Sequence, residues 1–235
     1  MNILAFETST AYESIALSSN GQIVADVTIR AKKTHSERLL PTVENLLAQT
    51  DMKLEDISAI AVSVGPGSFT GLRIGLSTAK GLCFGLKIPL YATSTLRSLA
   101  NNASSVSSNI CALMDAGRDE YYFAVYSSEL TEIHAPAFAK LEQIMKIVDN
   151  ETLIIGQVNS KIKQALFDTD AILNFAKEIN CYPKAASLID IIENNKGCDM
   201  YEADDIAKVE PLYIRKSAAE ENFKIKQRKN KNEKS

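Results

Sequence analysis

Apolar and polar residues in the first hundred positions change between strand and helix spacing. Short apolar runs predict strands at residues 3–6, 15–17 and 23–29, and an Asn20–Gly21 turn joins the last two. Helical spacing over residues 36–49 predicts an amphipathic helix with the apolar stripe Leu39, Leu40, Val43, Leu46 and Leu47. A buried strand at 59–64, a helix, a strand at 88–92 and a helix capped near Ser94 follow, so the predicted order is βββαβαβα.

The same order begins again in the second half. A strand at residues 109–114 ends in Asp115, as the first strand ends in Glu7, and a second strand follows at 121–126. Further segments predict helices at 141–148, 158–167 and 185–192 and a weak strand at 153–155. A duplicated unit of strand, hairpin and helix predicts an α/β fold with two lobes. We expect lobes at residues 1–105 and 106–219 and a basic, disordered extension at 220–235.

The composition is that of a globular protein, with 46% hydrophobic and 23% charged residues. Four cysteines without a C-x-x-C pair suggest free thiols in a reducing compartment. No basic leader and no run of 18 uncharged apolar residues occur, so we expect a cytoplasmic protein without a membrane span. The net charge is −3, yet residues 220–235 carry +3. That extension either contacts RNA phosphates or is a solvated tail.

The segment from Gly65 to Gly71, GPGSFTG, lies between a predicted buried strand and a helix. Glycines there allow backbone N–H groups to approach an anion at a helix N-terminus. The spacing fits neither a Walker loop nor a dinucleotide fingerprint, and Ser68 does not sit in a nucleophile elbow. Both a structural turn and a phosphate site therefore remain open.

The following helix carries small residues in two rows spaced by four. One row is Gly71, Gly75, Ala79 and Cys83, and the other is Ser77, Gly81 and Gly85. Glycine inside a helix costs about 1 kcal/mol relative to alanine, so these rows need a compensating close contact. The contact is either with the protein's own sheet or with a second subunit.

Glu7 and Asp115 end the first strand of each predicted lobe and can act as paired carboxylates around a metal or water, or can be capping groups. His35 and His134 are 99 positions apart, and no histidine or cysteine cluster offers a transition-metal site. We therefore predict no metal centre and no catalytic residue in this chain.

Several segments together resemble the TsaB (YeaZ) family. They are Phe6–Ser9, His35–Pro41, Gly65–Gly75, Ala79–Gly81, Ile88–Pro89 and Ser94–Leu96, with Asp115–Tyr121 and Pro211–Arg215 as sparser matches. The resemblance implies two ribonuclease-H-like lobes of the actin, Hsp70 and sugar-kinase superfamily, each a mixed sheet with flanking helices. Glu7 departs from the family pattern, in which an aspartate is usual.

The resemblance also implies a function. Family members are non-catalytic subunits of the bacterial machinery that places threonylcarbamoyl on N6 of adenosine 37 in tRNAs reading ANN codons. The catalytic paralogue TsaD and the ATPase TsaE are the implied partners, and tRNA is reached through the complex. ATP or ADP with magnesium is implied at the subunit interface rather than as an intrinsic cofactor.

Two hypotheses follow. In the first, the chain is a scaffold that binds TsaD, or a second copy of itself when alone, through Leu39, Val43, Leu46, Gly71, Gly75, Leu76, Ala79 and Cys83. In the second, it is a stand-alone ATPase or small-molecule kinase. The nucleotide or phosphate would then contact Glu7, Thr8, Ser9, Gly65, Gly67, Ser68 and Asp115. A peptidase has no support, because neither histidine is placed near Ser68 by a motif.

Overall fold

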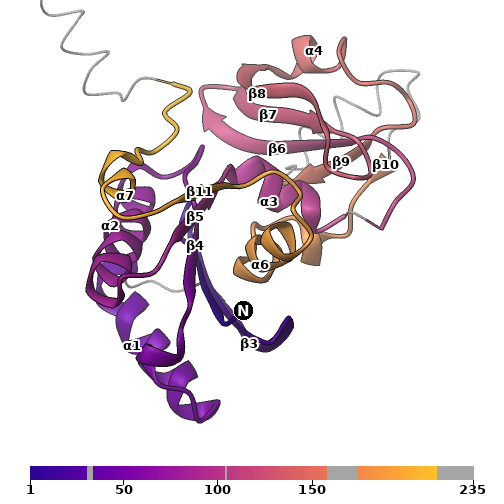
Figure 1. The fold of residues 1–235 in the computed structure, drawn as a ribbon. Helices are drawn as coiled ribbons and strands as arrows, with labels where there is room; N and C mark the ends of the chain where they lie inside the picture. The colour runs from indigo at the N-terminus through magenta and orange to yellow at the C-terminus, as the bar shows by residue number, and fades with distance from the viewer. Residues whose placement is uncertain (31–33, 104, 158–173, 216–235) are drawn as a thin grey trace, which may run out of the picture.

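The computed structural model describes residues 1–30, 34–103, 105–157 and 174–215. These residues form two mixed sheets, each with helices packed against it (Figure 1). Two lobes of α/β structure were predicted from the duplicated pattern, and the structure confirms them. Within the described ranges, none of the helices combines the length and apolar character that a membrane crossing needs.

The first sheet has six strands in the order β11-β5-β4-β1-β2-β3. Their bounds are β1 (Ile3–Glu7), β2 (Tyr12–Ser19), β3 (Gln22–Arg30), β4 (Ala59–Ser63), β5 (Leu90–Thr93) and β11 (Asp199–Tyr201). Parallel pairs join β1 to β4 and β4 to β5, whereas β2, β3 and β11 pair antiparallel. The carboxyl ends of β1, β4 and β5 therefore meet at one edge, where Glu7 lies.

Apolar side chains cover both faces of this sheet, and they differ in size between the faces. Large residues such as Leu4, Phe6 and Ile60 point toward α1 (His35–Gln49) and α2 (Phe69–Leu86). Small residues such as Ala5 and Ala61 point toward α6 (Ala185–Glu193) on the other face. Every β1 residue is buried, because the strand has helices on both sides.

The second sheet has five strands in the order β10-β9-β6-β7-β8. The bounds are β6 (Ile110–Gly117), β7 (Glu120–Tyr126), β8 (Glu132–Lys140), β9 (Leu153–Gly156) and β10 (Asn174–Phe175). One face packs on α3 (Thr95–Asn101) and the other on α4 (Leu141–Ile144). Short helical segments complete the described chain: η1 (Leu54–Asp56), η2 (Glu178–Asn180) and α7 (Asp205–Lys208).

The expected division at residue 105 separates the strands of the two sheets except for β11, which pairs with β5 of the first sheet. Two helices are also exchanged between the halves. α3 belongs to the first half of the sequence but packs on the second sheet, and α6 belongs to the second half but packs on the first sheet. The lobes are therefore interleaved along the chain.

The predicted order βββαβαβα is confirmed for the first half. In the second half, β8 was not predicted, and the helix expected at 141–148 is the single turn α4 followed by turns. The helix expected at 158–167 and the extension at 220–235 lie outside the described residues. The order of the second-lobe strands, which the sequence left open, is a β6–β7–β8 meander with β9 and β10 added in parallel.

Candidate functional site

The Gly-rich turn is joined by hydrogen bonds to the loop that follows β1. Ser68 caps α2, because its hydroxyl accepts a hydrogen bond from the Gly71 N–H at 3.2 Å. The Ser68 N–H donates to the Ser9 carbonyl at 2.7 Å, and the Thr8 hydroxyl donates to the Gly71 carbonyl at 2.8 Å. Two N–H groups at the start of α2 are thus used within the protein and do not face a ligand.

Close packing on this loop explains the glycines at 67, 71 and 75. A Cβ at Gly67 would overlap Ser9, and a Cβ at Gly71 or Gly75 would overlap Thr8. Gly65 differs from them, because its φ of +119° lies in a region that favours glycine. The glycines of the first small-residue row of α2 therefore contact the protein's own β1–β2 loop, and Ala79 and Cys83 of that row pack in the core.

This packing corrects most of the predicted partner interface. Gly71, Gly75, Leu76, Ala79 and Cys83 are buried inside the first lobe, as are Leu39 and Val43, and Leu46 is partly buried against the same core. None of the seven buried residues is available to a partner. The amphipathic stripe that suggested an interface packs on the sheet, except for the exposed Leu40.

The second small-residue row of α2 is exposed. A Cβ added at Gly81 or Gly85 would meet no atom within 4 Å, and Ser77 is exposed as well. Large apolar side chains are also exposed on α1 and α2. Phe84 of α2 is 50% exposed, and Leu40 of α1 is 48% exposed. We call Leu40, Ser77, Gly81, Phe84 and Gly85 the outer helix face.

A cleft of about 400 Å³ lies between the lobes. Of the predicted phosphate-binding residues, Ser9, Gly67, Ser68 and Asp115 line it, and Glu7, Thr8 and Gly65 do not. Both lobes contribute to its walls, so the sequence correctly brought Asp115 near the Gly-rich turn. Sequence reasoning missed three further residues that line the cleft, Arg30, Tyr12 and Tyr182. The ring centroids of Tyr12 and Tyr182 lie 4.0 Å apart.

Glu7 is buried beneath the β1–β2 loop, with 1% of its surface exposed. One carboxyl oxygen accepts the Ser9 N–H at 2.8 Å, and the other has no hydrogen-bond partner among the described residues. Burial raises the pKa of this carboxyl, and hydrogen bonds from Ser9 offset only part of that effect. Glu7 and Asp115 do not form a carboxylate pair in the cleft, because only the exposed Asp115 reaches it.

A second buried carboxylate, Glu13, holds the start of α1. It accepts a hydrogen bond from Arg38 at 2.9 Å and contacts His35 Nδ1 at 3.3 Å. His35 Nε2 lies 2.9 Å from the Thr10 carbonyl, so both ring nitrogens face acceptors. The Glu13 hydrogen bond raises the pKa of His35. No motif signalled Glu13, because it is an isolated acidic residue within a strand.

The described ranges contain no cluster of three or more histidine, cysteine, aspartate or glutamate side chains able to hold a metal ion. His35 faces Glu13 and Thr10, and His134 Nδ1 lies 2.8 Å from the Ala135 carbonyl. The Ser68 hydroxyl is engaged with the Gly71 N–H. This part of the protein therefore offers a cleft and an exposed helix face, without an arranged nucleophile and base.

Comparison with known proteins gives this architecture a family. The model of the family "TsaD: tRNA N6-adenosine threonylcarbamoyltransferase" matches residues 22–223. The tRNA threonylcarbamoyladenosine biosynthesis protein TsaB of Bacillus subtilis is 34% identical, over 94% of this chain and 96% of its own length. The chain belongs to the TsaB (YeaZ) family. The protein of the same name from Escherichia coli is 37% identical over 55% of this chain and 56% of its own.

Solved structures give the same result. YeaZ from Pseudomonas aeruginosa is 27% identical and has a TM-score of 0.73, covering 90% of this chain and 99% of that chain. A P. aeruginosa protein described as similar to peptidase YeaZ has a TM-score of 0.75 at 26% identity, covering 91% and 99%. An activator of 2-hydroxyisocaproyl-CoA dehydratase from Clostridium difficile shares the fold alone, with a TM-score of 0.51 at 12% identity, covering 83% and 97%. The TsaB family member described here thus shares its two-lobed fold with YeaZ from P. aeruginosa.

Proposed function

We propose that this TsaB family member is a non-catalytic scaffold in tRNA threonylcarbamoyladenosine biosynthesis that binds the catalytic paralogue TsaD. The complex would transfer threonylcarbamoyl to N6 of adenosine 37 in tRNAs reading ANN codons, with TsaE as a further subunit. The observation that carries the proposal is the outer helix face. Its small residues allow close approach of another helix, and Phe84 and Leu40 supply apolar anchors.

Similarity to the TsaD family model supports the choice of partner. A chain matched by that model over residues 22–223 is expected to share its fold with TsaD itself. Two related subunits can pair through equivalent surfaces, and here each would supply its counterparts of α1 and α2. The resulting four-helix contact would bury the five uncharged residues of the outer helix face, with Arg73 and Lys80 beside them on α2.

The absence of arranged chemistry in the described ranges supports a non-catalytic role. Glu7 is buried away from the cleft, His35 is held by Glu13 and Thr10, and no metal cluster exists there. In this proposal TsaD supplies the catalytic groups. ATP or ADP with magnesium would bind at the subunit interface of the complex, and tRNA would be contacted through the assembly.

Charge insertion on the outer helix face tests the proposal. Gly81→Lys places a charge where a Cβ meets no other atom, and lysine is a better helix former than glycine, so the chain should stay folded. We expect affinity for TsaD to fall by at least about tenfold, the effect of losing one modest hot-spot contact. The matched control is Ile133→Lys, an exposed position on β8 of the second lobe. Unchanged affinity of the folded Gly81→Lys chain would refute this interface.

Without TsaD, the outer helix face is proposed to pair with a second copy of the chain, because an exposed apolar helix pair favours association. Mass measurement in solution at micromolar concentration should find a dimer for the wild-type chain and for Ile133→Lys. Gly81→Lys should be monomeric. A wild-type monomer at these concentrations would disagree with self-association.

A second candidate is a stand-alone ATPase or small-molecule kinase, and the cleft between the lobes favours it. Ser9, Gly67, Ser68 and Asp115 are the cleft residues that would contact a magnesium nucleotide. Internal use of the Ser68 and Gly71 N–H groups leaves fewer donors for phosphate. Titration of the isolated chain with ATP and magnesium separates the candidates: tight binding with turnover favours the enzyme, and weak or absent binding favours the scaffold.

A further inference from the structure

The chain that follows α7 returns to the boundary between the two lobes. We call Val209–Arg215 the C-terminal strap. Val209 is buried in the core of the first lobe, and the Leu212 N–H donates to the Val64 carbonyl at 2.6 Å. Figure 1 shows this segment in orange and yellow, running from α7 past the ends of β6 and β7. The family segment 211–215, which the sequence singled out without a role, lies within it.

The middle of the strap is fixed to the start of α2. The ring of Tyr213 stacks on Phe69 with centroids 4.4 Å apart and an interplanar angle of 11°. Arg73 Nε donates to the Tyr213 hydroxyl at 2.9 Å, and its guanidinium carbon lies 5.9 and 5.8 Å from the Phe69 and Tyr213 centroids. A Cβ at Gly65 would lie 2.9 Å from the Leu212 carbonyl oxygen, so the strap also requires glycine at the turn before α2.

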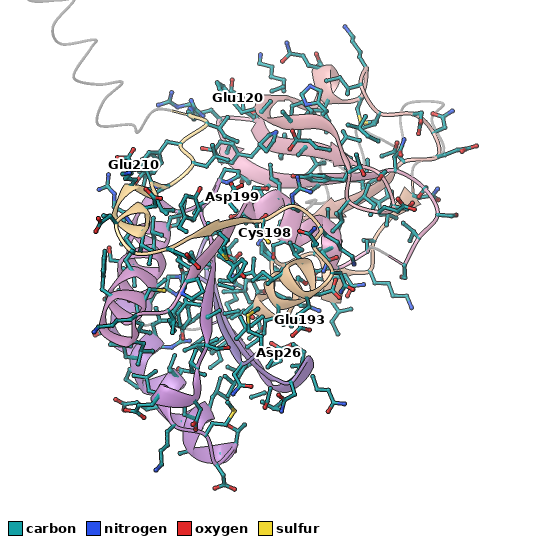
Figure 2. All side chains as sticks on the ribbon, in the orientation of Figure 1. Asp26, Glu120, Glu193, Cys198, Asp199 and Glu210 are labelled. Atoms are coloured by element: carbon teal, nitrogen blue, oxygen red, sulfur yellow. The ribbon has the colours of Figure 1, made fainter. Side chains whose placement is uncertain are left out.

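The end of the strap is fixed to the second lobe instead. Arg215 Nη1 donates to the Ala116 carbonyl at 3.1 Å and pairs with the Glu120 carboxylate at 3.0 Å. The Arg215 side chain is only 15% exposed, and its guanidinium carbon lies 6.0 Å from the Phe138 ring centroid on β8. Figure 2 labels Glu210 beside α7 and Glu120 at the start of β7, near the two ends of the strap.

These anchors lie next to the two walls of the cleft. Gly67 and Ser68 line the first-lobe wall, between the strap contacts at Val64 and Phe69. Ala116, whose carbonyl binds Arg215, lines the second-lobe wall. We propose that the C-terminal strap is a latch: it holds the lobes at one angle and fixes the Gly-rich turn at the start of α2. Its release opens the cleft and loosens that turn.

This inference goes beyond the proposed function, because the latch is a property of the isolated chain. The second-lobe end is held by a charge-assisted hydrogen bond of the mostly buried Arg215, and the first-lobe end by a partly exposed aromatic stack with a cation. Because the strap is one short segment fixed at both ends, breaking the second-lobe end should loosen the first-lobe end. Local opening of this sort is measured by amide hydrogen exchange.

The test is Arg215→Met in the full chain, which removes the guanidinium and keeps an unbranched side chain. Amides of residues 64–72, which Arg215 does not touch in the contacts described above, should exchange at least about tenfold faster, together with those of 115–120. Amides of the central strands β1 and β4 should be unchanged. Lys208→Met is the matched control, since it breaks an exposed ion pair with Asp205 next to the strap and within one lobe.

Unchanged exchange at residues 64–72 in Arg215→Met would overturn the latch. So would an equal increase across both lobes, which is the signature of general destabilisation, or the same pattern in Lys208→Met. Should Arg215→Met fail to fold, Glu120→Gln removes the same ion pair from the other side and must reproduce the predicted pattern. Failure of Glu120→Gln to change exchange at 64–72 would equally reject the proposal.

Discussion

At the scale of single residues, Glu7 is a buried carboxyl with an oxygen that lacks a hydrogen-bond partner among the described residues. Its raised pKa means that the folded protein binds the proton more tightly than the unfolded chain. Stability is therefore lost as the pH rises above the ordinary value of 4.5 toward the folded pKa. Glu7→Gln cannot ionise and keeps an acceptor for the Ser9 N–H.

We expect Glu7→Gln to raise the free energy of unfolding at pH 8 by about 1–3 kcal/mol, because the neutral amide avoids the cost of burying an ionised carboxylate. Denaturant unfolding of the variant should also depend less on pH than that of the wild type. Glu13→Gln is the contrasting variant, because Glu13 pairs with the Arg38 guanidinium and contacts His35. The Glu13→Gln chain should lose about 3 kcal/mol of unfolding free energy. Destabilisation by Glu7→Gln would show that the ionised carboxylate is needed.

His35 gives a pH dependence of stability in the same direction as Glu7, from a different cause, because here folding favours the charged form. Its raised pKa means that the charged form is stabilised by folding, so its contribution is fully present below the ordinary value of 6.5. The contribution is lost as the pH rises through the folded pKa. Unfolding free energies measured from pH 6 to 9 should therefore fall by about 1 kcal/mol more in the wild type than in His35→Gln. Parallel pH profiles would contradict the Glu13–His35 pairing.

At the scale of elements, α2 has two glycine rows with opposite environments. Gly75→Ala would force a Cβ into Thr8 and should destabilise the chain by about 1–3 kcal/mol through overpacking. Gly81→Ala meets open space in a helix interior and should stabilise it by about 1 kcal/mol. Thermal or denaturant unfolding of the two variants measures both. Equal effects at the two positions would contradict the assigned faces of α2.

The periodicity of α1 and α2 predicted the helices correctly and their apolar stripes as contact surfaces. It did not distinguish contact with the protein's own sheet from contact with a partner, because both bury the same side chains. The choice depends on which part of the chain lies beneath the helix, as with Gly71 against Thr8 of the β1–β2 loop. The row of Ser77, Gly81 and Gly85 was predicted to need a close contact, but its residues were not among those predicted for the partner interface.

At the scale of the whole molecule, the duplicated pattern predicted two lobes. The acidic residue that ends the first strand of each repeat drew attention to Asp115, which lines the cleft. The exchange of α3 and α6 and the return of β11 to the first sheet could not be predicted from local patterns. They are long-range pairings, and short segments such as β11 carry little periodic signal. Glu7 was predicted to contact a ligand, but it is buried outside the cleft, because its exposure depends on how the β1–β2 loop folds above it.

The central claim is that this chain supplies a docking surface while TsaD supplies the chemistry. Its most direct test is transfer of threonylcarbamoyl to tRNA, measured with the purified chain alone and with TsaD, TsaE and threonylcarbamoyl-adenylate added. We expect no modified adenosine from the chain alone, full modification by the complete mixture, and at least about tenfold slower modification when Gly81→Lys replaces the wild type at subsaturating concentration. Modification of tRNA by the chain alone would contradict the account.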